Sequence, residues 1–361
     1  MAMEASVPLT PVQIVNEIVE RSEAILEGNF TSRGDRKFRS YAVTNFRGGI
    51  GKSTLSFNLA FEVARHRRTL LLDTCSQRNF SQNLLGDDIL NVEKTIYDVL
   101  VREIAGASPV DPEDLLVSVK ESCASFKRGK TAFLLPGSTE LYLFPSLLYS
   151  TLAQYQQIPQ RSLREETTRR VINAVRTAIS TVSANAKPEI VLIDTSPFFG
   201  GATHLAWAAA DALIIPVRVD QHSIEALKQT LQMLSNEEQD FLRFNKQAGL
   251  AHQPIVHAVA ITHCGWNRQR ANTPDSSTRY FVEKAVEIAQ EFSRHFSEPN
   301  VGNCFYLLDD FHSSGRISGK QRIPLSELQP GKKFMVEGQR LEVNPSVVRY
   351  QLEIQNLASD L

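Results

Sequence analysis

The sequence lacks the features that would place it in a membrane or in a disulfide-stabilised class. It has no run of about 18 apolar residues, and residues 1–11 contain neither the basic nor the apolar segment of a signal peptide. Its four cysteines are widely spaced and form no CxxC pair, which argues against a disulfide framework and against a zinc site. These absences predict a soluble, cytoplasmic protein.

An excess of charge of either sign is also missing. The 39 basic residues nearly balance the 40 acidic ones, which leaves a formal net charge of -1. No global field therefore draws the chain to nucleic acid or to an anionic membrane, and any such affinity must be local. With 361 residues, 42% of them hydrophobic and 22% charged, the composition is that of a globular protein with a sizeable core.

Short apolar runs alternate with segments of helical periodicity over most of the chain. Such an alternation predicts an α/β fold with a doubly wound, mainly parallel sheet and helices on both faces. Ligands in folds of this kind bind at the carboxyl ends of the strands. The runs expected to form strands are residues 41–46, 69–73, 132–135, 189–194, 212–217, 255–262 and 304–308.

A helix is predicted near each end of the sequence. Thr10, Pro11 and Gln13 form the pattern of a capping box, and the apolar residues that follow at helical spacing require a partner surface. This first helix either packs on the main domain or serves as a partner-binding or dimer-swapping arm. Toward the other end, a hairpin or loop precedes a final helix that runs to about residue 357. The expected division is a helix and linker at 1–39, a main domain at 40–325 and a loop or hairpin with a helix at 326–361.

The most informative residues follow the first apolar run. Gly48, Gly49 and Gly51 precede Lys52 and Ser53, between a predicted strand and a predicted helix. Glycines let backbone N–H groups turn inward around phosphates, a lysine reaches the terminal phosphate oxygens, and a hydroxyl after it ligates magnesium. This segment is therefore predicted to bind the phosphates of a nucleotide.

The segment RGGIGKST at 47–54 resembles the deviant Walker A motif of the ParA/MinD-type ATPases, which form the CobQ/CobB/MinD/ParA nucleotide-binding domain. Four further segments match this family in order, and the resemblance extends over about residues 40–325. It implies a P-loop NTPase of the ParA-like branch that binds ATP and Mg²⁺. The matching segments are LLLDTCSQRN at 70–79, TIYDVL at 95–100, IVLIDTSP at 190–197, and ADA with IEAL between 210 and 227.

The resemblance also implies the roles of individual residues. Arg47, with Lys52 and tentatively Asp73, is expected to act in ATP hydrolysis. An apolar strand that ends in Asp194 places a carboxylate beside the loop, so Asp194 and Ser53 are expected to hold magnesium. The nucleotide contacts are expected from Arg47, Gly48, Gly49, Ile50, Gly51, Lys52, Ser53 and Thr54, the last near the α-phosphate.

Arg47 stands where the family has a signature lysine that reaches the ATP of the partner in a dimer. An arginine keeps the positive charge and can contact phosphate with two donors, although its fork is longer and planar. We therefore expect an ATP-dependent homodimer in which Arg47 makes this contact. The alternative is that Arg47 faces solvent or its own triphosphate.

Cys75 is the more serious departure from the family pattern. When Gln77 and Asn79 are aligned with the second motif, Cys75 takes the place of an aspartate thought to position or activate the attacking water. A neutral thiol is a poor base, and losing a positioned base slows a step by roughly 10² to 10⁴. Hydrolysis is therefore predicted to be slow, unless another group such as Asp73 takes over.

DNA binding, a usual activity of the family, would need a local basic face. Residues 312–333 are basic, whereas residues 266–294 are nearly balanced in charge. In a dimer such a face is doubled and could follow phosphates without sequence preference, but the same residues also fit a solvated surface or a loop beside the nucleotide. The basic stretch contains Arg316, Lys320, Arg322, Lys332 and Lys333 against Glu327.

The sequence thus predicts a ParA-like ATPase that dimerises on MgATP and engages DNA or a cargo partner in partitioning or positioning. The protein partner would be a ParB-like protein or a cargo adaptor, and DNA binding would place the chain on the nucleoid. No membrane partner is expected, because the C-terminal segment has Arg349 against Glu353 and Asp360, the wrong charge for anionic lipid. Two alternatives stay open: a non-hydrolysing ATP-gated regulator or scaffold, and an ATP-dependent synthetase or amidotransferase on the same fold.

Overall fold

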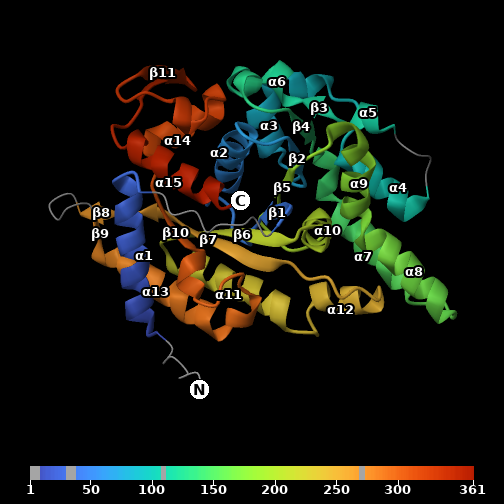
Figure 1. The fold of residues 1–361 in the computed structure, drawn as a ribbon. Coiled ribbons are helices and arrows are strands. Elements are labelled where there is room, and N and C mark those ends of the chain that lie inside the picture. The colour runs from blue at the N-terminus through green and yellow to red at the C-terminus, as the bar shows by residue number, and fades with distance from the viewer. Residues whose placement is uncertain (1–8, 30–37, 107–110, 268–272) are drawn as a thin grey trace.

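A computed structural model of the chain describes residues 9–29, 38–106, 111–267 and 273–361, and its centre is an eight-stranded sheet (Figure 1). The strand order is β10-β7-β6-β1-β5-β2-β4-β3, and every pairing is parallel except that of β3 with β4. The strands are β1 (Ser40–Val43), β2 (Thr69–Asp73), β3 (Val117–Ser118), β4 (Ala132–Leu135), β5 (Ile190–Asp194), β6 (Ala212–Arg218), β7 (Ile255–Cys264) and β10 (Phe305–Asp309).

The helices lie on both faces of this sheet, so the predicted fold class is confirmed. They are α1 (Pro11–Leu26), α2 (Lys52–Ala64), α3 (Asn79–Leu85), α4 (Ile96–Ala105), α5 (Pro112–Leu115), α6 (Val119–Ser122), α7 (Phe144–Tyr155), α8 (Arg161–Ile172), α9 (Ala174–Ala186), α10 (Ala202–Ala209), α11 (Gln221–Ser235), α12 (Asp240–Gln247), α13 (Ser276–Glu291), α14 (His312–Gln321) and α15 (Val347–Ser359). Two antiparallel strand pairs lie outside this sheet: β8 (Trp266–Asn267) with β9 (Thr273–Pro274), and the hairpin of β11 (Lys333–Val336) with β12 (Gln339–Glu342).

The seven predicted strands are all present, with bounds that differ by a few residues. The largest difference is at β1, which ends at Val43 rather than at residue 46, because the chain turns there into the glycine-rich loop. The short antiparallel strand β3 was not predicted, since two residues are too few to show an alternating pattern.

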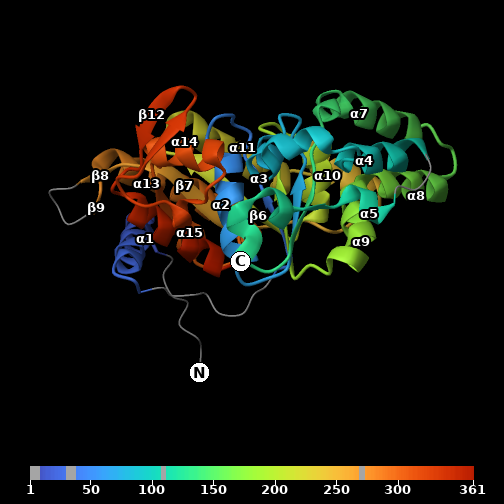
Figure 2. The same ribbon diagram turned by 90° about the horizontal axis from the view of Figure 1, so that it is seen from above.

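Each face of the sheet has its own hydrophobic core, because successive strand residues point to opposite sides. Leu70 and Leu72 of β2 pack in one core, with α1 and the helices from α9 to α13, whereas Leu71 packs in the other. The second core lies under α2, α3 and α15, which cover the opposite face of the sheet (Figures 1 and 2). The carboxyl ends of the parallel strands are left for the loops that form the site.

The predicted terminal helices are both present and both packed. Thr10 caps α1 through the expected capping box with Gln13, and the buried face of α1 contacts α13, α15 and β10. The last helix, α15, packs on α2 and begins at Val347, after the β11–β12 hairpin. Its position in the second core explains its apolar face without a membrane. Among the described residues, no helix is long and apolar enough to cross a membrane.

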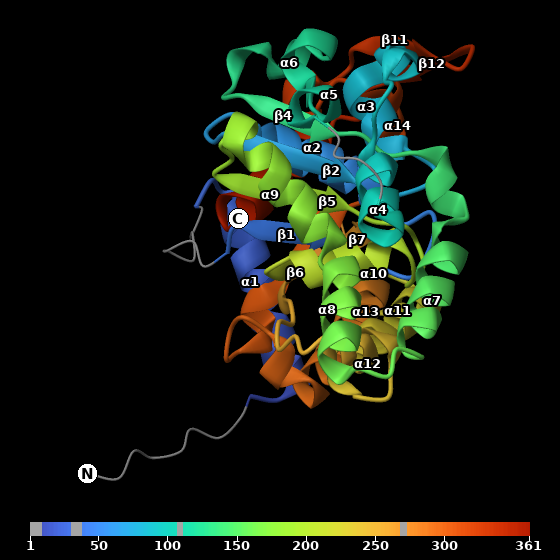
Figure 3. The same ribbon diagram turned by 90° about the vertical axis from the view of Figure 1, so that its right-hand side faces the viewer.

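The segment between β4 and β5 forms α7, α8 and α9, and with α12 it builds the side of the molecule that lies farthest from α1 (Figures 1 and 3). The loop after β5 packs against this side, because a Cβ atom on Gly201 would lie 2.8 Å from Pro145 of α7. The linker predicted at the end of the segment 1–39 lies mostly outside the described residues.

Candidate functional site

The glycine-rich loop connects β1 to α2 at the carboxyl edge of the sheet. Gly49 and Gly51 have φ angles of +73° and +83°, a region in which a side chain is strained, so glycine is required at both positions. Asn45 holds the start of the loop: its amide donates to Pro216 O at 2.7 Å, and its Oδ1 accepts from Arg47 N at 2.8 Å. This role of Asn45 was not predicted, because its partner lies 171 residues away in the sequence.

Lys52 and Ser53 form the first turn of α2 and face two different partners. Lys52 Nζ donates to Arg47 O at 2.6 Å, so the ammonium group turns back toward its own loop. Ser53 Oγ donates to Asp194 Oδ2 at 2.9 Å, and Ser56 Oγ donates to Asp194 Oδ1 at 2.6 Å. The structure thus brings together the lysine, the hydroxyl and the carboxylate that the sequence predicted as neighbours.

Burial shifts the pKa values of both charged groups in this cluster. It raises the pKa of Asp194 to about 7, together with the nearby Asp73, while the hydrogen bonds from Ser56 and Ser53 act in the opposite direction. Burial lowers the pKa of Lys52 to about 8, although the negative charge of Asp194 opposes that shift. A bound divalent cation would favour the ionised carboxylate, and bound phosphates would favour the ammonium group.

The raised pKa of Asp194 predicts a pH dependence of stability. In the folded state Asp194 stays protonated up to a higher pH than in the unfolded state. Its contribution to the free energy of unfolding is therefore largest below pH 4 and declines as the pH rises through about 7. In urea denaturation without nucleotide or metal, the stability of the wild type relative to Asp194→Asn should fall by about 1 kcal/mol per pH unit in this window. A difference between the two proteins that does not change with pH would contradict the shift.

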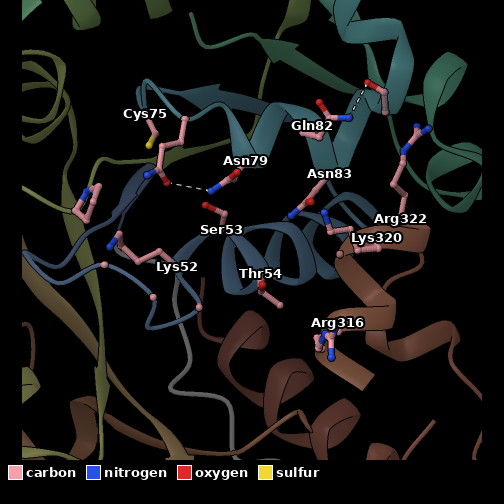
Figure 4. A pocket seen from close by; sticks show the side chains of 18 of the residues that line it. Lys52, Ser53, Thr54, Cys75, Asn79, Gln82, Asn83, Arg316, Lys320 and Arg322 are labelled. Atoms are coloured by element: carbon pink, nitrogen blue, oxygen red, sulfur yellow. Dashed lines mark hydrogen bonds between the residues drawn. The ribbon is translucent and has the colours of Figure 1, made fainter. Parts of the chain in front are cut away.

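Cys75 follows β2 and lies at the same end of the pocket as Lys52 and Ser53 (Figure 4). Its side chain is buried, and burial, with the charge of Asp73, raises the pKa of the thiol to about 11. The sulfur is therefore a protonated thiol at neutral pH and has no capacity to act as a base there.

Asp73 lies deeper than its predicted catalytic role requires. It is fully buried, and its carboxylate accepts from Cys75 N at 3.0 Å and from Ser81 N and Oγ at 2.8 and 2.7 Å. Burial raises the pKa of Asp73, while these hydrogen bonds oppose the shift. Both oxygens therefore hold the turn between β2 and α3, and the residue does not line the pocket.

Arg47 points toward α11 in this structure. Its guanidinium forms an ion pair with Asp220, the N-cap residue of α11, and a 3.0 Å hydrogen bond to Ser223 Oγ. The side chain is 30% exposed. In the single chain the guanidinium is thus held by Asp220, and contact with a partner's nucleotide or with its own triphosphate stays a prediction.

The pocket around the loop has a volume of about 770 Å³ and extends from the phosphate-binding loop to α14. Figure 4 shows Lys52, Ser53 and Cys75 at one end and Arg316, Lys320 and Arg322 at the other. Three residues predicted to contact the nucleotide or the metal do not line it directly: Ile50 and Asp194 are buried, and Arg47 is turned toward α11. Residues that line the pocket but were not proposed as ligand contacts include Gln77, Asn79, Gln82, Asn83, Asp87, Thr195, Pro197 and Glu337.

Most basic side chains of the predicted basic stretch at 312–333 have acidic or backbone partners. Arg316 and Lys320 of α14 line the pocket and pair with Glu337 at the tip of the β11–β12 hairpin. Arg322 donates to the backbone carbonyls of Leu84, at 3.0 Å, and Ser122. Of the alternatives for this stretch, the structure favours a segment beside the nucleotide pocket.

A strand, a glycine-rich loop with a lysine, and a helix at the carboxyl edge of a parallel sheet define a P-loop nucleotide-binding protein. A family profile described as an AAA domain (AAA_31) matches residues 38–247. The chain belongs to this family and, within it, to the ParA/MinD-type P-loop ATPases.

Curated relatives agree with this assignment. The chain is 28% identical over 191 residues to the sporulation initiation inhibitor protein Soj of Bacillus subtilis, a match that covers 53% of this chain and 62% of Soj. It is 26% identical over 285 residues to the chromosome partitioning protein ParA of Myxococcus xanthus, covering 77% and 85% of the two chains. The fold also resembles that of Cyanothece McdA in a complex of a point variant with ATP, with a TM-score of 0.59, 16% identity and coverage of 90% and 97%.

Proposed function

We propose that this chain binds MgATP and uses it as a switch for dimerisation, as a ParA-like partitioning ATPase with slow hydrolysis. The observation that carries the proposal is the joint placement of Lys52, Ser53 and Asp194 beside the glycine-rich loop. The ATP complex of the McdA variant, on the same fold, supports the choice of nucleotide.

The residues present fit a triphosphate and a divalent cation. Backbone N–H groups of Gly48 to Gly51 would face the phosphates, and Lys52 would leave Arg47 O to contact them. Ser53 and Asp194 supply the oxygen ligands that Mg²⁺ prefers, already 2.9 Å apart. When bound, the cation neutralises charge on the phosphate oxygens.

Slow turnover would follow from the chemistry of Cys75, which lines the pocket beside Lys52, and of Asp73, which lies buried behind it. Cys75 is a protonated thiol, and Asp73 is held by the turn that follows β2. Neither group is available to accept a proton from an attacking water, so we assign Asp73 a positioning role instead of a catalytic one. A non-hydrolysing ATP-gated regulator is the second candidate function, which Cys75 favours.

Dimerisation on ATP would use Arg47. In the single chain the Arg47 guanidinium is paired with Asp220. We propose that this ion pair breaks when nucleotide occupies the pocket, so that Arg47 can reach the phosphates of a second copy. Engagement of DNA, or of a ParB-like or cargo partner, is proposed from the relatives that partition chromosomes. Such an activity would place the chain in the cytoplasm, at the nucleoid.

A tryptophan at the base of the loop provides the test of this function. Trp207 is fully buried, donates to Thr44 Oγ1 at 3.0 Å, and stacks on Phe46 with 5.7 Å between ring centroids. Because Thr44 and Phe46 lead into the loop, Trp207 should report nucleotide binding, and Trp266→Phe removes the other tryptophan of the chain.

In the Trp266→Phe protein, MgATP should change the Trp207 emission in a saturable way, and light scattering should show a doubled mass with ATP but not with ADP. Calorimetric titration checks binding independently of the fluorescence. A chain that binds no nucleotide in calorimetry would overturn the proposal. Nucleotide binding without a change in mass would exclude the dimerising ATPase and leave the second candidate function, an ATP-gated regulator acting as a monomer.

A further inference from the structure

The end of the nucleotide pocket that lies farthest from the glycine-rich loop is lined by one face of α14. Arg316 and Lys320 lie four residues apart on this helix, so their side chains leave it on the same side. Gly315 and Gly319 line the same wall and have no side chains that would fill the space beside the two cations. Figure 4 shows Arg316 and Lys320 at the opposite end of the pocket from Lys52.

Both cations meet a single carboxylate inside the pocket. Lys320 Nζ lies 2.8 Å from Glu337 Oε1, and Arg316 Nη2 lies 3.6 Å from Glu337 Oε2. The hydrogen bond from Lys320 lowers the pKa of the Glu337 carboxyl group, and the charge of Arg316 acts in the same direction, so the group stays ionised at neutral pH. Two cations that approach both oxygens of one anion form the arrangement of an occupied anion site.

Glu337 is an occupant that can leave this position without unfolding its surroundings. It lies at the tip of the β11–β12 hairpin, whose backbone is anchored by the buried Val336, while its own side chain is 55% exposed. A pair as exposed as this one contributes little to stability, so its side chain can rotate into solvent at small cost. A phosphate group carries more charge and more acceptor oxygens than a carboxylate and would therefore replace it.

A third cation is fixed at the same end of the pocket. Arg322 donates to the carbonyl oxygens of Leu84, at 3.0 Å, and of Ser122, and its side chain packs directly against Gly86. These carbonyl groups hold the guanidinium in place but do not cancel its charge. The potential at this end therefore favours an anion once Glu337 has turned away.

The site lies where the nucleoside of a bound nucleotide would be. The phosphates are assigned to residues 48–53, and Thr54 is expected near the α-phosphate, so the ribose and the base would extend beyond Thr54. The pocket continues from Thr54 to α14 as one cavity of about 770 Å³. ATP has no charged group on its ribose and would leave Arg316 and Lys320 to Glu337.

We propose that Arg316 and Lys320 form a second anion subsite, which holds a phosphate group on the ribose of a nucleotide whose 5′ phosphates occupy the glycine-rich loop. The inference rests on the proposed function, because it uses the same pocket, and it adds a further class of ligand. A nucleotide phosphorylated on its ribose would compete with MgATP and keep the chain from its ATP-bound state. Glu337 would act as the resident counter-ion of this subsite until such a ligand arrives.

The test compares ligands that differ by one phosphate group. Adenosine 5′-monophosphate, adenosine 3′,5′-bisphosphate and adenosine 2′,5′-bisphosphate are each titrated in competition with MgATP by calorimetry on the full chain. The variant Arg316→Ala/Lys320→Ala removes the subsite, and Glu337→Gln releases it from its counter-ion. The matched controls are Lys332→Ala/Lys333→Ala, which removes two positive charges outside the pocket lining, and Glu342→Gln, which alters the other paired carboxylate of the hairpin.

In the wild type one of the two bisphosphates should bind at least about tenfold more tightly than the monophosphate, because two cations face the added phosphate. This ratio should fall to near one in Arg316→Ala/Lys320→Ala, rise several-fold in Glu337→Gln, and stay at the wild-type value in both controls. The ratio also tests more than folding, since each variant is its own reference.

Two results would overturn the inference. One is that neither bisphosphate displaces MgATP from the wild type more strongly than the monophosphate does. The other is that the ratio of affinities is the same in Arg316→Ala/Lys320→Ala as in the wild type. A wild type that fails to bind MgATP itself would instead overturn the proposed function.

Discussion

Replacing Lys52 by alanine should weaken ATP binding by about two orders of magnitude and reduce any hydrolysis by roughly 10² to 10³. The ammonium group lies at the start of α2 beside the glycine-rich loop, it is 7% exposed, and its only recorded hydrogen bond in the described structure is to Arg47 O. A charge that is shielded from solvent interacts with phosphates much more strongly than a charge in water does, because the local dielectric constant is lower. Calorimetric titration with MgATP measures the loss.

The matched control removes a positive charge from the other end of the same pocket. Arg316→Ala should change the ATP affinity by less than about tenfold, because Glu337 already neutralises Arg316 and its side chain is 53% exposed. The folded state of the Lys52→Ala protein should remain intact, since burial of the ammonium disfavours its charged form. An affinity of Lys52→Ala within a few-fold of the wild type would contradict the proposed phosphate site.

The second large effect is expected at Cys75, where an aspartate should accelerate ATP hydrolysis by about 10² or more. The thiol lines the pocket beside Lys52 and Ser53, so a carboxylate there would face the reacting end of the nucleotide. Burial and the charges of Asp73 and Asp194, which raise the pKa of the thiol, would also raise the pKa of the new carboxyl group. Because a base acts in its ionised form, the gain should grow as the pH rises.

Steady-state phosphate release, measured from about pH 6 to pH 9, checks this expectation. The control is Cys75→Ser, which keeps the size and supplies no base, and its rate should stay near that of the wild type. Asp73→Ala should mainly lower the free energy of unfolding, because Asp73 holds the turn through Ser81 and Cys75. Its effect on the rate of hydrolysis per bound nucleotide should be smaller. Fast hydrolysis by the wild type, insensitive to Asp73→Ala, would show that Cys75 does not limit turnover.

Much of the fold was predictable because its signals are local. A strand buried on both faces appears as a continuous apolar run, and the seven predicted strands are all found. The caps of α1 were readable for the same reason, since Thr10 and Gln13 lie three residues apart. Strand β3 escaped prediction because its two residues derive their structure from pairing with β4.

The candidate site was partly predictable for a different reason. The loop residues lie close together in the sequence, so their spacing is enough to predict the conformation of the loop. They are Gly49, Gly51, Lys52 and Ser53. The partner of Arg47 was not predictable, because Asp220 reaches it only through the pairing of β1 with β6 and the start of α11. The same holds for Glu337, which neutralises Arg316 and Lys320 from a hairpin outside the matched segment.

The sequence by itself determined the α/β class, the phosphate-binding loop and the substitution of Cys75, because each depends on residue type and short spacing. The tertiary structure alone decided which charges remain available. It paired Arg316 and Lys320 with Glu337 and Arg322 with backbone carbonyls, and it brought the turns at 65–68 and 127–130 into contact. Net charge and local charge runs can be counted from the sequence. The electrostatic potential at a surface depends instead on the distances between charged groups, which only the packing of the sheet and helices determines.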